Sequence, residues 1–199
     1  MDHPPTKRLH LPCLATLTVD DAQFLSHIHA PSLTCLGINC SSSFDSLQSI
    51  SSFTGVETLV LYGQPQSEVV PSALWDLSGV RLLIFHAPDS LGHLRPRIEY
   101  SVFVEFFEAM NEDARGFTWP RLRCIHFKGP HAGKRAFLPT WALLQFVQKR
   151  NAEHNASQRT ARIEEIIIER PSDIDSEMDP ETAVQLGQLT TLRGGVDSL

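Results

Sequence analysis

Two histidines and a glutamate are the residues of this chain best suited to proton transfer: His86, His126 and Glu165. Each lies in a predicted strand, and a histidine beside a carboxylate can act as a general base near neutral pH. The chain has 9 histidines, however, so such groupings arise easily by chance. The nucleophile turn Gly-x-Ser-x-Gly is absent from the sequence. We therefore expect no catalytic residues, and keep a small α/β hydrolase or transferase with a His/Glu site as the alternative.

Metal and phosphate sites are poorly supported by the remaining polar clusters. His27 and His29 are two residues apart, a spacing that does not place both on one helix face. The carboxylates of 173–181 alternate with other residues as in a calcium loop, but the glycine of the sharp turn is missing. Residues 129–134 lack the spacing of a phosphate-binding loop and the Ser or Thr after lysine. We expect no metal and no cofactor.

Composition narrows the classes of partner and compartment. The net charge is −6 and the pI about 5.8, which argues against a nucleic-acid surface. No apolar run approaches the roughly 18 residues of a membrane span. The N-terminus lacks a secretory apolar core, so we expect a cytoplasmic or nuclear protein. The 4 cysteines form no Cys-x-x-Cys pair, which favours free thiols.

The strands that would position these side chains share one pattern of three apolar anchors. The second anchor follows the first by three residues, and the third follows two residues later. Proline stands two residues before the first anchor in three stretches, and glycine one residue before it in two others. The six first anchors are Leu14, Leu33, Val56, Val80, Leu122 and Ile163. Their spacings are 19, 23, 24, 42 and 41 residues, and a leucine-rich repeat unit has about 20–29 residues.

Helix signals fall between the anchored stretches. Residues 22–28, 101–112 and 140–147 have helical apolar spacing, and Asp179-Pro180 marks a further helix start. The polar run 148–162 is expected to be an exposed helix end and loop. Strand, helix and strand in succession predict parallel strands. We predict an α/β fold, a leucine-rich-repeat-like solenoid with about six parallel strands on the concave side and irregular helices on the convex side.

The predicted solenoid forms a single domain over residues 1–199. We expect residues 1–8 to be a disordered or truncated N-terminus, and residues 171–199 to be an irregular C-terminal capping segment.

The stretches Leu-Pro-x-Leu-x-x-Leu-x-Val (11–19) and Ala-Pro-Ser-Leu-x-x-Leu-x-Ile (30–38) resemble the leucine-rich-repeat-like regions of F-box proteins from mushroom-forming fungi. The resemblance covers about residues 9–170 and is degenerate. In that family an F-box docks onto a cullin-type ubiquitin ligase, and the repeat region presents substrates. Residues 1–8 are too few to form an F-box, so we expect none within this sequence. The resemblance therefore implies a ubiquitin-ligase adaptor as partner only if a longer form carries an F-box.

A second departure concerns the Asn or Cys that usually stands three residues after the third anchor. The corresponding positions are Ala22, Ser41, Gln64, Pro88, Pro130 and Pro171. A buried asparagine ladder is therefore not expected, and the curve should be less regular.

Alternate strand residues point to opposite sheet faces, so the residues between the anchors should form the concave, partner-binding face. The expected binding residues are Thr58, Val60, Tyr62, Leu82, Ile84, His86, His126, Lys128, Glu165 and Glu169. The middle of this row is apolar, which is typical of a protein-binding site with a polar rim. We expect a noncatalytic protein–protein interaction module. Two alternatives stay open: a loop of the same chain covers Leu82, Ile84 and Ile167, or the chain is a degenerate fragment without function.

Overall fold

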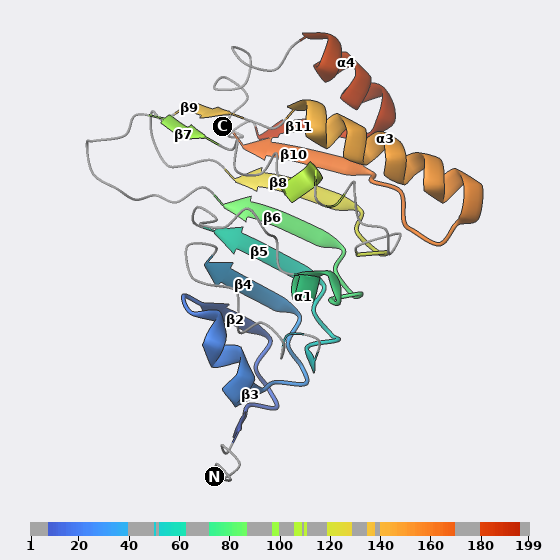
Figure 1. Ribbon diagram of the computed structural model, residues 1–199. Coiled ribbons are helices and arrows are strands. Elements are labelled where there is room, and N and C mark those ends of the chain that lie inside the picture. Colours follow the sequence, from blue (N-terminus) through green and yellow to red (C-terminus); the bar gives the residue numbers. More distant parts are fainter. Residues whose placement is uncertain are drawn as a thin grey trace.

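The molecule is a mixed α/β structure built on one seven-stranded parallel sheet (Figure 1). The computed structural model describes residues 8–39, 50, 52–62, 72–86, 97–99, 106–108, 110, 119–128, 135–137, 140–169 and 180–195. The strands lie side by side in chain order. They are β2 (Thr16–Val19), β4 (Cys35–Asn39), β5 (Thr58–Tyr62), β6 (Leu82–His86), β8 (Cys124–Lys128), β10 (Glu165–Glu169) and β11 (Thr191–Gly195). The first six contain the second and third anchors of the six stretches, so these six predicted strands and their parallel order are confirmed.

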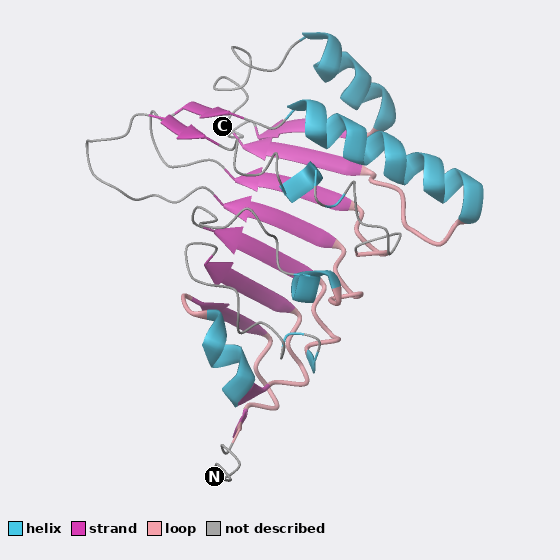
Figure 2. Cartoon of the chain, viewed as in Figure 1, coloured by secondary structure: helices cyan, strands magenta, loops and turns pink. Residues whose placement is uncertain are grey.

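The helices lie on one face of this sheet (Figure 2). They are the 3-10 helix η1 (Ala22–His27), α1 (Ser72–Trp75), α3 (Thr140–Ser157) and α4 (Pro180–Leu189). Residues 106–108 are also helical, whereas the rest of the predicted helix 101–112 lies mostly outside the described residues. Two small parallel sheets pair β1 (Leu9–His10) with β3 (Ile28–His29), and β7 (Arg97–Glu99) with β9 (Arg135–Phe137).

A β-turn precedes five of the six anchored strands and explains the proline and glycine signals. The N–H of the first anchor donates to the carbonyl three residues earlier. These bonds run from Leu14 to Leu11, Leu33 to Ala30, Val56 to Phe53, Val80 to Leu77 and Leu122 to Trp119. Proline fills the second turn position, where its fixed φ suits the turn, and Gly55 and Gly79 fill the third. Neither glycine has a positive φ, so space explains them: a Cβ on Gly79 would lie 2.7 Å from the Val56 carbonyl oxygen.

Successive turns are joined by a repeated pair of hydrogen bonds just before each strand. The Ala15 carbonyl accepts from the N–H groups of both Thr34 and Cys35, at 2.9 and 3.0 Å. The equivalent carbonyls of Thr34, Glu57, Arg81 and Arg123 do the same for the next unit. Because this arrangement recurs from strand to strand, it sets a common register across the sheet.

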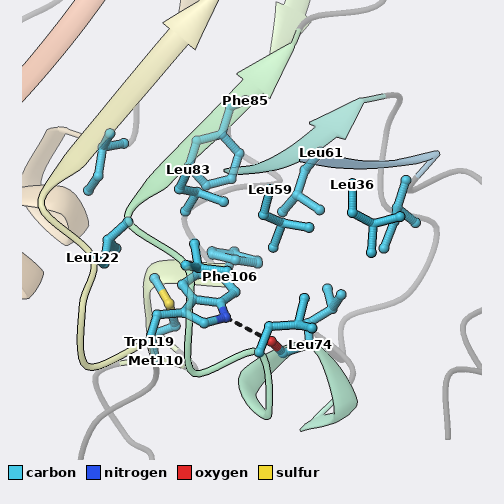
Figure 3. Packing of buried hydrophobic residues seen from close by; sticks show 14 of the residues in the cluster. Leu36, Leu59, Leu61, Leu74, Leu83, Phe85, Phe106, Met110, Trp119 and Leu122 are labelled. Atoms are coloured by element: carbon cyan, nitrogen blue, oxygen red, sulfur yellow. Dashed lines mark hydrogen bonds between the residues drawn. The ribbon is translucent and has the colours of Figure 1, made fainter. Parts of the chain in front are cut away.

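The second and third anchors point to the helical face and are buried there, as predicted, except that Leu17 in β2 is half-buried. Their exposed fraction is 1% or less at Leu59, Leu61, Leu83, Phe85, Ile125 and Phe127. Aromatic rings fill the space between sheet and helices; Phe85 stacks on Phe127 with centroids 5.3 Å apart. Trp119 is fully buried, and its indole N–H donates to the Leu74 carbonyl at 2.7 Å (Figure 3). Hydrophobic burial across the whole stack, rather than any single unit, therefore holds the fold together.

The sixth unit replaces the turn by side chains of α3, and this corrects one expectation. The polar run 148–162 was expected to be exposed, but Arg150 and Asn151 are only 2% and 5% exposed. Asn151 Oδ1 accepts a hydrogen bond from the N–H of Ile163 at 3.0 Å. In the other five units the N–H of the equivalent first anchor donates to the carbonyl of the turn instead. Arg150 donates to the carbonyls of Trp119 and Ala161, and burial lowers its pKa to about 10. Buried polar groups need such partners, and Arg150 and Asn151 have them; Thr160, in the same run, is 2% exposed as well.

The C-terminal end contains regular elements where an irregular segment was expected. Within 171–199, the structure describes α4 and β11, and α4 begins at the predicted Pro180. β11 pairs in parallel with β10 as a seventh strand. Residues 1–7 lie outside the described residues.

Candidate partner-binding face

All ten residues predicted to bind a partner lie on the sheet face opposite the anchors, which we call the open face. Each one is half-buried, whereas its strand neighbours Leu59, Leu83 or their equivalents are buried. The parallel register arranges these residues in three rows. The first row runs Thr58, Leu82, Cys124, Glu165; the second runs Val60, Ile84, His126, Ile167; the third runs Tyr62, His86, Lys128.

The middle of the open face carries an apolar strip formed by Val60, Leu82 and Ile84. Val60 and Ile84 are direct cross-strand neighbours, and Leu82 lies two residues before Ile84 on the same strand. The next residue in the row is His126, followed by Ile167. Apolar side chains at the centre of a sheet face, between polar ends, have the composition of a protein-binding surface.

Tyr62 borders the strip on β5, two residues after Val60, and its hydroxyl reaches past β4 to the end of β2. Its hydroxyl donates to the Val19 carbonyl at 2.8 Å and lies 3.3 Å from Asp20 Oδ1. Asn39, on the strand between them, donates to the same carboxylate at 3.4 Å. The Tyr62 hydroxyl is therefore engaged within the chain.

An ion pair and a histidine–carboxylate contact border the strip on the side of β10 and β11. His126 Nε2 lies 3.0 Å from Glu169 Oε1, and Arg193 Nε lies 2.8 Å from Glu165 Oε1. Neither contact is a hydrogen bond by its geometry. The contact of Arg193 with Glu165 is an ion pair, and that of His126 with Glu169 is a close approach of a ring nitrogen to a carboxylate oxygen. Sequence reasoning missed Arg193, because nothing in 191–195 resembles the anchored stretches.

The sequence placed Glu165 beside the histidines, and the structure gives it other partners. Glu165 Oε2 accepts a weak hydrogen bond from Cys124 Sγ at 3.8 Å, while its second oxygen contacts Arg193. Burial, helped by the Glu165 charge, raises the pKa of the Cys124 thiol to about 11. A thiol with this pKa is protonated at neutral pH and is a poor nucleophile.

Metal chemistry finds no support in the part of the chain that the structure describes. No group of three or more His, Cys, Asp or Glu side chains could hold a metal ion there. Cys13, Cys35 and Cys124 are free thiols. The acidic residues 173–179 and the loop 129–134 lie outside the described residues.

Comparison with family models and with curated proteins finds no match for this chain. Among the helices of the described ranges, none is both long enough and apolar enough to span a bilayer.

Proposed function

We propose that the protein is a noncatalytic recognition module, a leucine-rich-repeat-like solenoid that binds another protein through its open face. The observation that carries this proposal is the apolar strip of Val60, Leu82 and Ile84, half-buried at the centre of a sheet face between polar ends. Burying such a strip against a partner would supply the binding free energy.

The solenoid assignment rests on a repeated local geometry. The same turn and the same two-donor carbonyl recur from unit to unit, and the parallel strands follow chain order. In a solenoid each unit contacts its neighbours and buries their shared core, as the anchors do here. Because the strands on the open face are in register, a partner laid across them would meet several units at once.

The polar ends of the open face fit a role in recognition. Glu165 is in contact with Arg193 and Cys124, and His126 with Glu169. The pairs fit a role in specificity, since charge complementarity tunes partner choice and association rate more than affinity.

By its resemblance to F-box proteins, the recognised protein is a substrate for ubiquitination if a longer form carries an F-box. The compartment that fits this role and the free thiols is the cytoplasm or the nucleus. The test of this part is whether the longer form, expressed in the source cell, co-purifies with ubiquitin-ligase subunits.

Binding through the open face is tested with one substitution made at two places. Val60 is half-buried in the apolar strip, whereas Val184 on α4 is 59% exposed. We expect Val60→Glu to abolish capture of the partner from source-cell lysate, and Val184→Glu to leave it unchanged. Val60→Thr, which keeps the side-chain shape, should weaken capture without loss of fold. Equal capture by both glutamate variants, with both folded by circular dichroism, would exclude the open face as the binding surface.

A further inference from the structure

Among the described residues, the N-terminal end of the sheet presents an edge strand whose outward backbone groups pair with no other strand. β2 is the last strand of the sheet, and within the described ranges no strand pairs with its outer side. The Ala15 carbonyl points to β4, where it accepts from Thr34 and Cys35. By the alternation of a parallel ladder, Leu17 also points to β4, and the backbone groups of Thr16 and Thr18 point outward.

The core is incompletely covered at this same end. Leu14 and Leu17 are half-buried, whereas the equivalent anchors of the next unit, Leu33 and Leu36, are 1% and 0% exposed. Phe24 of η1 is 62% exposed and Leu9 of β1 is 58% exposed. A unit of a stacked array buries its anchors only when a neighbour lies on each side, and the first unit has a described neighbour on one side only.

The two ends of the sheet differ in how their edges are protected. Exposed edge strands usually carry a charge, proline or a bulge that prevents pairing with another chain. β2 reads Thr-Leu-Thr-Val and has none of these residues, whereas β11 carries Arg193 and ends in Gly194-Gly195. An edge of β-branched and apolar residues without charge favours added strands.

We propose that β2 is a self-association edge, at which two copies of this chain pair antiparallel and join their sheets. A twofold axis perpendicular to the sheet places the same face of both copies on the same side. Leu17 then lies beside Leu17 or Val19 of the second copy, and threonines face threonines on the other side. β2 has no charged residue, so the pairing places no like charges opposite each other. Head-to-tail pairing with β11 would instead bring Arg193 and two glycines to the edge and would leave an open-ended fibre.

Sedimentation equilibrium of the full chain and of three variants tests this edge. Thr16→Pro removes an outward N–H without touching the ladder to β4, and we expect it to weaken dimerisation by about ten- to a hundredfold, because one bond is lost from each copy. Phe24→Lys should also weaken the dimer. Val184→Lys changes a residue of similar exposure on α4 and should leave the dimer constant unchanged.

Amide exchange supplies an independent readout. The N–H groups of Thr16 and Thr18 should exchange slowly at concentrations that favour the dimer and rapidly on dilution. A chain that is monomeric at its highest soluble concentration overturns the proposal. A dimer that Thr16→Pro leaves intact overturns it as well, because association would then use another surface.

Discussion

Replacing Gly79 by alanine tests the stacked turns, on which the register of the whole sheet depends. The new Cβ would lie 2.7 Å from the Val56 carbonyl oxygen and 3.0 Å from that of Thr54. Both are backbone atoms of the preceding turn, so relief requires the two turns to move apart. Overpacking of this kind costs about 1–3 kcal/mol, and the stiffer unfolded chain returns about 0.4–1 kcal/mol. The free energy of unfolding should fall by about 1–2 kcal/mol.

Alanine substitutions at two further glycines give a series in which the new Cβ is progressively less crowded. A Cβ on Gly55 would lie 3.2 Å from the Leu33 carbonyl oxygen, so Gly55→Ala should cost less than Gly79→Ala. A Cβ on Gly187, inside α4, would meet nothing within 4 Å. Gly187→Ala should therefore stabilise the protein by about 0.5–1 kcal/mol through helix propensity. Urea unfolding with an unchanged m-value gives each difference. If Gly79→Ala is as stable as wild type, the close approach of the turns is refuted.

Three other predictions follow from burial and backbone geometry. Leu59 is fully buried at the second anchor of β5, so Leu59→Ala should lower the free energy of unfolding by about 2–5 kcal/mol. A change near zero in urea unfolding would contradict its place in the core. Iodoacetamide at pH 8 should alkylate Cys124 more slowly than the exposed Cys13. Glu165→Gln should accelerate alkylation of Cys124, because the Glu165 charge helps to raise the pKa of that thiol. Peptide mapping that finds Cys124 modified before Cys13 would contradict this prediction. Gln158 follows α3 with φ 55°, so Gln158→Gly should raise the thermal midpoint by removing a strained left-handed conformation, and a lowered midpoint would count against this interpretation.

The sheet could be predicted from the sequence because its signals are local. The anchors, together with proline or glycine in the preceding turn, lie within nine residues of one another. The anchors recur in all six units, and the proline or glycine in five of them. Alternation along a strand then assigned Val60 and Ile84 to one face and Leu59 to the other, as found.

The remaining features depend on groups that are distant in sequence. Asn151 is buried because it satisfies the N–H of Ile163, a partner 12 residues away that only the fold identifies. β11 has no anchor pattern and pairs along the edge of β10. The pairing of His126 with Glu169 rather than Glu165 depends on side-chain direction across two strands, which spacing alone does not determine.

Photo-crosslinking from a single position gives the most direct test of partner binding at the open face. A photoreactive amino acid replaces Leu82 in the apolar strip in one variant, and Val184 on α4 in another. After irradiation in source-cell lysate, we predict one discrete crosslinked protein from position 82 and none from position 184. Crosslinking from position 184 alone, or no discrete product from position 82 in the folded variant, would contradict the assignment of the open face.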